Sequence, residues 1–514
     1  MKNKFFLLLA SVAFLSVAVN AQNSLTLKVD QANVKINKEI YGHFSEHLGT
    51  CIYGGIFVGE KSNIPNINGY RTDVVNALKE MKVPVLRWPG GCFADTYHWK
   101  DGIGPRENRP SIVNVHWGGV TEDNSFGTHE FLNFCELIGT EPYLSINVGS
   151  GTIQEASEWV EYVTSSNESP MTELRKKNGR EDPWNVKFWG IGNETWGCGG
   201  EMRPEYYADV YRNFSCYVRG NGLKKIAVGP SGDDLNWTDK MMASLMQRSF
   251  LAQGLSLHYY TLPTGDWGAK GSSTQFGEAE WFETIKRTLF VEDYIKKHLE
   301  VMDKYDPKKN ISLVVDEWGT WYDPLPGSNP GFLQQQNTLR DAVVAGVNLN
   351  IFNNHADRIS MANIAQIINV LQSVILTKED KMVLTPTYYV FKMYNVHQDA
   401  TLVPTELKCE NYVYNGQSIP AVNASSSIKD GVLSITFSNM NPNKSVSVDC
   451  NVAGGEYKKA SGKIITAKNI TDYNDFGKAE TVNMQDFKVN NPVKGKLNVE
   501  IPAHSVVLVQ LKAN

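Results

Sequence analysis

The chain begins with apolar and polar residues in alternation and changes to a different rhythm near residue 40. Residues 24–29 and 32–36 alternate, which predicts two half-exposed strands. From residue 40 onward, short apolar runs are separated by stretches of a dozen residues or more. Such runs are typical of strands that are buried on both faces. The runs that predict buried strands are 40–44, 84–87, 142–147, 186–191, 225–228, 255–258, 311–316 and 359–365.

The stretches between most of these runs carry apolar residues at helical spacing. Val74, Leu78 and Met81 share one helix face, and residues 207–214 and 295–302 show the same spacing. Eight strands that alternate with helices predict an α/β protein built on a (β/α)8 TIM barrel. A doubly wound sheet is the alternative. It is disfavoured because no phosphate-type glycine loop follows the first strand.

Beyond residue 385 the pattern becomes that of an all-β domain. Short strand-like runs are separated by turns rich in Asn, Gly and Lys, which predicts a β-sandwich. Its strands are expected at 412–414, 432–437, 446–448, 497–501 and 506–511. The two strands before residue 40 need partners, so we expect a sandwich domain formed from both chain termini.

The first residues predict a cleavable signal peptide. Lys2 and Lys4 precede an apolar run, and Val19-Asn20-Ala21 ends it with a small-residue cleavage site. This run is short for a membrane-spanning helix, and no later run is longer, so no membrane span is expected after signal removal. We therefore expect a secreted or periplasmic protein. The predicted organisation is a signal peptide at 1–21, N-terminal sandwich strands at 22–39, a barrel at 40–384 and the sandwich at 385–514.

Composition and charge narrow the class of partner. The chain of 514 residues is 42% hydrophobic, which is ample for a large core and for more than one domain. Its net charge is −5 and it has no basic run, so it lacks the electrostatic footprint of a nucleic-acid-binding protein. The 12 Trp and 22 Tyr fit a carbohydrate partner, because sugar faces stack on aromatic rings, although large cores use them as well.

The cysteines and one short motif bear on metal binding. Seven cysteines are scattered along the chain and form neither a disulfide framework nor a C-x-x-C zinc site. One or two bridges stay open in an oxidising compartment. Residues 43–47 match the H-x-x-E-H pattern of zinc peptidases. That chemistry needs a helix, and Gly42 and Gly49 bracket the segment, so no metal and no cofactor are expected.

Two glutamates stand out because each ends a buried strand beside tryptophan and glycine. Glu194 follows residues 186–191, and Glu317 follows residues 311–316. In a ring of eight strands, the fourth and seventh open on facing sides of the mouth where barrels carry catalytic groups. Two carboxyls about 5–5.5 Å apart cleave a glycosidic bond with retention. Asn193 can bind a hydroxyl beside the reacting carbon, so Glu194 is the better acid/base and Glu317 the nucleophile.

Further polar residues close the neighbouring strands. Arg87 ends the second strand, where a charge-assisted hydrogen bond can hold a carboxylate nucleophile ionised. Residues 41–49 close the first strand with polar groups, His258 and Tyr260 close the sixth, and Gln366 lies at the end of the eighth. We expect these side chains to line the same mouth.

With these residues, the chain resembles the α-L-arabinofuranosidases of glycoside hydrolase family 51 over nearly the whole length after the signal. The resemblance rests on Gly42-x-Phe44-x-Glu46-His47-Leu48-Gly49, Arg87-Trp88-Pro89-Gly90-Gly91, Gly190-Ile191-Gly192-Asn193-Glu194, His258-Tyr259-Tyr260, Asp316-Glu317-Trp318 and Ala362-Asn363-Ile364-Ala365-Gln366. It implies the same fold, with Glu194 as acid/base and Glu317 as nucleophile. It also implies an arabinose subsite formed by Glu46, Arg87, Cys92, Asn193, His258, Tyr260 and Gln366. Many members carry Asn in place of Cys92, and others carry Cys.

The resemblance further implies a retaining, exo-acting hydrolase without a metal. It would release terminal α-L-arabinofuranosyl residues from arabinan, arabinoxylan or arabino-oligosaccharides. Members of the family are often homo-oligomers. Two alternatives stay open: another glycosidase on the same scaffold, such as an endoglucanase, and a non-catalytic carbohydrate-binding protein on an inactive barrel.

Overall fold

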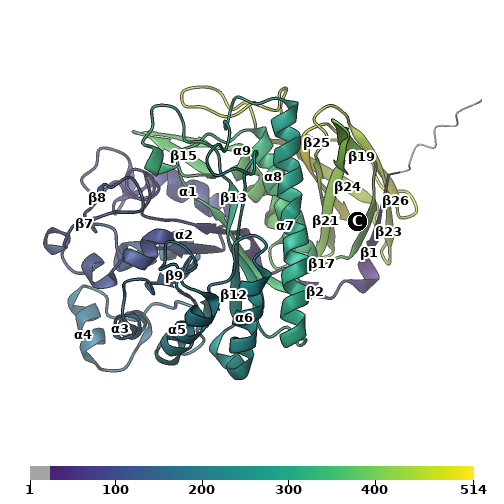
Figure 1. Ribbon diagram of the computed structural model, residues 1–514. Coiled ribbons are helices and arrows are strands. Elements are labelled where there is room, and N and C mark those ends of the chain that lie inside the picture. The colour runs from purple at the N-terminus through teal and green to yellow at the C-terminus, as the bar shows by residue number, and fades with distance from the viewer. Residues whose placement is uncertain (1–22, 514) are drawn as a thin grey trace, which may run out of the picture.

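The computed structural model describes residues 23–513, which form a barrel with a β-sandwich beside it (Figure 1). The predicted signal peptide at 1–21 lies outside the described residues. Parallel strands close the barrel in the order β10-β11-β12-β13-β14-β3-β6-β9, so the predicted fold class is confirmed. Their bounds are β3 Gly42–Phe44, β6 Val85–Trp88, β9 Glu141–Ile146, β10 Phe188–Ile191, β11 Lys224–Ala227, β12 Gly254–Thr261, β13 Ser312–Thr320 and β14 Ile359–Ala365.

The barrel strands follow the predicted apolar runs because both of their faces are buried. One face packs under the helices, and the other fills the inside of the barrel with a separate cluster of side chains: Val85, Tyr143, Phe188, Ile226, Val314 and Met361. The first strand is shorter than expected. A 3-10 turn, η2 (Lys38–Tyr41), takes the beginning of the predicted run, so β3 starts only at Gly42.

Helices surround the barrel where the helical spacing predicted them. In α1 (Thr72–Met81), Val74 and Leu78 are fully buried on the apolar face. Helix α2 (Thr128–Ile138) ends at Gly139, whose φ of +74° is the left-handed conformation that glycine adopts at a helix C-terminus. The other helices are α3 Ile153–Thr164, α4 Pro170–Lys177, α5 Pro204–Tyr217, α6 Leu235–Leu245, α7 Glu278–Tyr305, α8 Leu339–Asn354 and α9 Pro386–Tyr394.

The sandwich consists of a four-stranded sheet, β18-β1-β23-β26, and a seven-stranded sheet, β2-β17-β21-β22-β27-β24-β25. The N-terminal strands β1 (Ser24–Lys28) and β2 (Val34–Lys35) pair with strands from the C-terminal part of the chain. The remaining strands are β17 Thr401–Leu402, β18 Thr405–Lys408, β21 Val422–Lys429, β22 Val432–Asn439, β23 Val446–Ala453, β24 Lys459–Ile465, β25 Met484–Phe487, β26 Lys496–Ile501 and β27 Ser505–Lys512.

Four two-stranded hairpins complete the strand inventory of the described residues. They are β4 (Asn66–Ile67) with β5 (Tyr70–Arg71), β7 (Ile112–Val113) with β8 (Thr121–Glu122), β15 (Ile375–Lys378) with β16 (Lys381–Leu384), and β19 (Asn411–Tyr414) with β20 (Gln417–Pro420). The run at 412–414, which we expected in the sandwich, therefore forms a hairpin of its own.

Helices α7 and α8 join the two parts of the molecule. Every residue of α8 except the last is buried, because one side packs on the barrel and the other on sandwich strands β21 and β22. Gly346 permits this close packing, since a Cβ there would lie 2.5 Å from Ser438 Oγ. Helix α7, the long teal helix in Figure 1, stands between the barrel and the sandwich, and Trp281 donates from it to the Met440 carbonyl.

Candidate active site

The two predicted catalytic glutamates lie at the carboxyl ends of barrel strands, at the same mouth. Glu194 lies in the turn that follows β10. Glu317 lies within β13 and pairs in register with His258 of β12. The register of β13 against β14 shifts between Val315 and Trp318, and irregularities of this kind re-aim side chains. The fold thus brings together residues that are far apart in the sequence.

His258 joins the two carboxyl groups. Its Nδ1 lies 2.8 Å from Glu194 Oε1 and 3.6 Å from Glu317 Oε2. One ligand-type atom from each of these three residues falls within 4.8 Å of the other two. The two carboxyl groups therefore face the same small volume.

Arg87 holds Glu317 from the opposite side. Its Nη1 donates to Glu317 Oε1 at 2.8 Å, and its Nη2 donates to Asn193 Oδ1 at 2.5 Å. Tyr260 donates its hydroxyl to the other oxygen, Glu317 Oε2, at 2.8 Å. Because Arg87 is fully buried, water does not weaken this charged pair. Both oxygens of Glu317 thus accept hydrogen bonds from protein side chains.

The pKa values of Glu194 and His258 both depend on the negative charge of Glu317. Burial and the negative charge of Glu317 raise the pKa of Glu194, although its hydrogen bond with His258 opposes this rise. Burial lowers the pKa of His258, but the charges of Glu317, Asp316 and Glu194 outweigh it and raise the pKa to about 10. At neutral pH the mouth therefore holds a protonated His258 beside a Glu194 that retains its proton more strongly than a free glutamate.

Glu46 lies in the turn after β3, and Gly91 stands between its carboxylate and that of Glu317. Its Oε1 accepts from the backbone N–H groups of Gly91 at 2.9 Å and Phe93 at 3.1 Å, and from Trp117 Nε1 at 2.8 Å. Its Oε2 accepts from Gln366 Nε2 at 3.0 Å. All of the side chains that the resemblance assigned to the arabinose subsite, with Cys92 considered below, thus gather around one opening.

The pair Gly90-Gly91 lets the loop after β6 approach these carboxylates. A Cβ at Gly91 would lie 3.0 Å from Glu317 Oε1, and one at Gly90 would lie 2.6 Å from Glu46 Cγ. Side chains at these positions would therefore crowd the site. Burial, with the nearby charge of Glu317, raises the pKa of Glu46 to about 7.

Three residues of this cluster were not among the predicted site residues. Asp316 Oδ2 accepts from the Tyr143 hydroxyl at 2.8 Å, and Asp316 Oδ1 lies 3.1 Å from His258 Nε2. Trp117 reaches the site from the loop between β7 and β8. The sequence pattern could have indicated Asp316, because a second carboxylate next to Glu317 in an apolar strand needs a buried partner. No sequence pattern indicates Tyr143 or Trp117.

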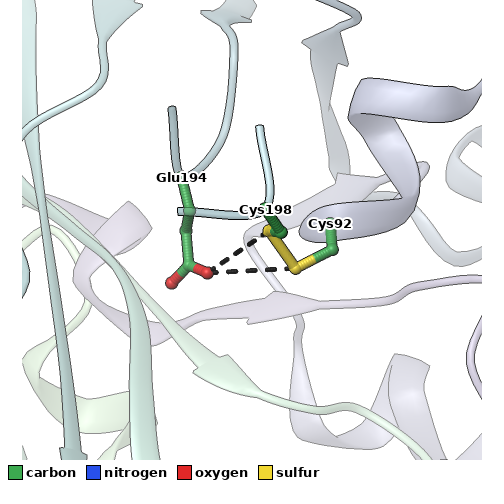
Figure 2. A group of neighbouring side chains, drawn as sticks. All are labelled: Cys92, Glu194 and Cys198. Atoms are coloured by element: carbon green, nitrogen blue, oxygen red, sulfur yellow. Dashed lines mark hydrogen bonds between the residues drawn. A yellow bond between two sulfur atoms is a disulfide. The ribbon is translucent and has the colours of Figure 1, made fainter. Parts of the chain in front are cut away.

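Cys92 is bonded to Cys198, which ties the loop after β6 to the loop after β10 (Figure 2). The Cα atoms of the pair are 5.5 Å apart. The two sulfurs lie 4.0 and 3.7 Å from Glu194 Oε2. A disulfide sulfur has no proton to donate, so any hydrogen bond here requires a protonated Glu194 as the donor. Cys92 thus stands at the wall of the site as a disulfide and not as a thiol.

Among residues 23–513, two groups of side chains have the spacing of metal ligands. One consists of Cys92, Cys198 and Glu194 and contains no thiolate, because the sulfurs are bonded to each other. The other consists of Glu194, His258 and Glu317. Both ring nitrogens of His258 already contact carboxylates, Nδ1 with Glu194 at 2.8 Å and Nε2 with Asp316 at 3.1 Å. His43 and His47 of the H-x-x-E-H pattern lie on β3 and in the turn after it, not on a helix.

A cavity of about 680 Å³ opens from the catalytic cluster to the surface. Its inner end includes Cys92, Glu194 and Tyr260, and its outer part is mostly aromatic. A concave, largely apolar cavity with a few converging polar groups is the usual form of a small-molecule site.

Comparison with known proteins identifies the family. Family models described as Alpha-L-arabinofuranosidase 1 domain and Alpha-L-arabinofuranosidase C-terminal domain match residues 77–240 and 316–505. A protein of Bacteroides ovatus named intracellular exo-alpha-L-arabinofuranosidase is 57% identical, covering 98% of this chain and 99% of its own. The crystal structure of the family 51 arabinofuranosidase from Xanthomonas axonopodis pv. citri matches with a TM-score of 0.93 and 50% identity, over 96% of this chain and 100% of that one. The chain is a family 51 α-L-arabinofuranosidase.

More distant members of the family keep the same architecture. The thermostable family 51 α-L-arabinofuranosidase from Thermotoga petrophila is 31% identical and has a TM-score of 0.84, covering 96% of this chain and 100% of its own. The resemblance stated from the sequence is therefore confirmed.

The expected location of this family 51 enzyme is wrong. The Bacteroides ovatus relative is named intracellular, which overturns the prediction of a secreted or periplasmic protein. A short apolar run after two lysines is only a compositional pattern, so it carries less weight than a relative this similar. Within residues 23–513, no helix has both the length and the apolar character needed to cross a membrane.

Proposed function

We propose that this family 51 enzyme is a retaining exo-α-L-arabinofuranosidase in which Glu317 is the nucleophile and Glu194 the acid/base. The observation that carries this proposal is the approach of the two carboxyl groups, whose oxygens lie within 4.8 Å of each other. That approach belongs to the closer of the two carboxylate spacings of glycosidases, about 5–5.5 Å between the groups, which leads to retention. The wider spacing of inverting enzymes, about 6.5–9.5 Å, exceeds this approach.

The surroundings of each carboxyl support these separate roles. Glu317 is held by hydrogen bonds from Arg87 and Tyr260, which orient its carboxylate for attack on the anomeric carbon. Glu194 has a raised pKa, so it can protonate the leaving oxygen. Once it has given up that proton, its carboxylate lies against the protonated His258, which stabilises it for the second step. There Glu194 deprotonates a water that releases the sugar.

We also propose that the arabinofuranosyl ring is bound by Glu46, Arg87, Cys92, Asn193, His258, Tyr260 and Gln366. Two of these side chains have polar atoms left for a ligand. Asn193 Nδ2 and Gln366 Oε1 are both buried and form no hydrogen bond with any described residue. Buried polar atoms without partners are costly, and sugar hydroxyls would satisfy one donor and one acceptor. The proposed substrates are arabinose-containing oligosaccharides and polysaccharides, as the exo-acting name of the Bacteroides ovatus relative also suggests.

Hydrolysis of 4-nitrophenyl α-L-arabinofuranoside tests the proposal beside the matching β-D-xyloside and β-D-glucoside. We expect cleavage of the arabinofuranoside alone, with the first released sugar in the α configuration by NMR. Preferred cleavage of the glucoside would instead favour the endoglucanase alternative. Binding without turnover would favour a carbohydrate-binding protein.

A further inference from the structure

The cavity beside the catalytic cluster extends well beyond the residues proposed to hold arabinose. Its outer part is formed by Trp267, Trp321 and one face of α7. That face presents Arg287, Phe290 and Tyr294, which are spaced by three and four residues and are all half-buried. Within residues 23–513, none of these side chains forms a hydrogen bond or ion pair with Glu194 or Glu317, so bond cleavage does not account for them.

Two rows of aromatic rings lead outward from the site. In the first, Tyr260, which binds the Glu317 carboxylate, meets Trp321 edge to face at 4.9 Å, and Trp321 meets Trp267 at 5.2 Å. In the second, Tyr259 meets Tyr294 at 5.4 Å on the α7 side of the cavity. Apolar sugar faces pack on rings of this kind, so the cavity offers stacking surfaces along its length.

Polar groups lie between these rings. The Arg287 guanidinium packs directly on the backbone of Gly265, where a Cβ would lie only 2.3 Å from Nη1, and the φ of +74° at Gly265 also favours glycine. The Arg287 side chain is 29% exposed, and its ion-pair contact with Glu283 is 3.7 Å long, so guanidinium N–H groups remain available at the cavity surface. Asp233 faces the same cavity from the loop after β11. A donor and an acceptor are thus placed where sugar hydroxyls would reach them.

We propose that this outer part of the cavity, formed by Trp267, Trp321, Arg287, Phe290, Tyr294 and Asp233, binds the second sugar of the leaving group. The proposal rests on the proposed function and specifies its substrate class: arabinose attached to a chain of at least two further sugars. The occupant is the leaving chain because the cavity is continuous with Glu194, which protonates the bond to that chain. Arabinose linked to a single sugar fills only the inner part.

The test compares chain lengths. The probes are α-1,5-linked arabinobiose and arabinotriose, with 4-nitrophenyl α-L-arabinofuranoside as the reference. We expect kcat/KM for the wild type to be about tenfold higher on the triose than on the biose, since one more stacked ring is worth roughly that factor. Trp267→Ala and Arg287→Met should each bring the ratio close to one, mainly by raising KM for the triose.

Trp267 is 56% exposed, so its loss should leave the fold intact, and Tyr206→Ala on α5 is a control with the same exposure, 56%, outside the cavity. This control should keep the wild-type ratio. Equal kcat/KM on biose and triose in the wild type, with the aryl substrate cleaved, would overturn this inference and leave the proposed function standing. A ratio unchanged in both variants would overturn it as well. A wild type that does not cleave the aryl arabinofuranoside would remove the proposed function and this inference together.

Discussion

Two fully buried histidines, one in the barrel mouth and one at the sandwich, have opposite charge states. His258 is surrounded by carboxylates, which raise its pKa to about 10. His397, after α9, lies between the hydroxyls of Ser427 at 2.7 Å and Thr436 at 3.2 Å, and burial lowers its pKa to about 3. Burial alone makes a histidine neutral, because the charged form loses its hydration.

The surroundings of the two histidines differ in the same way. The sandwich side buries neutral groups that satisfy one another, such as Asn350, Ser425 and Thr436. The barrel mouth buries ions, which cost several kcal/mol each unless they are paired. Replacement of such a network by apolar side chains is often neutral or stabilising, so folding alone does not require it. The contrast between neutral groups at the sandwich and ions at the barrel mouth indicates that the buried charges of the mouth are needed for catalysis. Each prediction below tests this interpretation.

The largest effect is expected for Glu317→Ala. Without the nucleophile, no glycosyl-enzyme can form, so turnover should fall about 10⁴-fold or more with every leaving group. The measurement is kcat on the aryl arabinofuranoside, with azide added to detect direct displacement. Substantial turnover without an added nucleophile would remove Glu317 from its proposed role.

The next effect is expected for Glu194→Ala, and it should depend on the leaving group. Loss of a general acid costs roughly 10²–10⁴-fold when the leaving group is poor, and less when it is 4-nitrophenolate, which needs little protonation. The basic limb of the wild-type pH–rate profile should also disappear, because it reports deprotonation of the acid. A variant that keeps this limb, or loses activity equally on all leaving groups, would contradict the assignment.

A smaller and more selective effect separates the two histidines. His258→Gln removes the positive charge beside Glu194, so the pKa of Glu194 should rise and the basic limb should move to higher pH, with kcat lowered roughly tenfold to hundredfold. His397→Gln should leave the basic limb and kcat unchanged. It should lower the free energy of unfolding by about 1–3 kcal/mol, because glutamine replaces the hydrogen bonds of His397 imperfectly. Similar kinetic changes in both variants would erase the distinction between the two regions.

The sequence predicted much of this arrangement because strand ends are easy to locate. Glu194, Glu317 and Arg87 could be placed at one mouth since each follows an apolar run in an eight-strand pattern. The roles of these residues stay predictions until variants are measured. The same pattern says nothing about contacts between loops, so the bond between Cys92 and Cys198 could not be inferred from two cysteines that are 106 residues apart.

Other features of the site could not be predicted from the sequence, for similar reasons. The register of β13 against β12 shifts between Ser256 and His258, beside Asp316, and bulges leave little trace in apolar periodicity. The face of α7 that carries Arg287 and Tyr294 has the pattern of an ordinary half-exposed helix face. Its place in the cavity is apparent only from the fold, which puts the loop of Trp267 on the same cavity. The location was predicted wrongly because it depended on a terminal composition pattern alone.

The smallest effect is expected in the pH dependence of stability, and it again compares the two histidines. Between pH 8 and 9, His258 is protonated in the folded protein, with a pKa of about 10, and neutral in the unfolded chain, where histidine titrates near 6.5. Folding therefore binds one proton in this window. The stabilisation is complete below about pH 6.5 and is lost as the pH rises toward 10, at a slope of up to about 1.4 kcal/mol per pH unit.

Chemical denaturation at pH 8.0, 8.5 and 9.0 measures this slope. His258→Gln should flatten it, because the variant lacks the imidazole that takes up this proton on folding. His397→Gln should keep it, because His397 is neutral in both states at this pH and binds no proton on folding. Equal slopes in wild type and His258→Gln would mean that His258 is neutral in the folded protein. In that case the stabilisation of the Glu194 carboxylate after proton transfer would have to come from Arg87 alone, and the contrast between the barrel mouth and the sandwich would lose its physical basis.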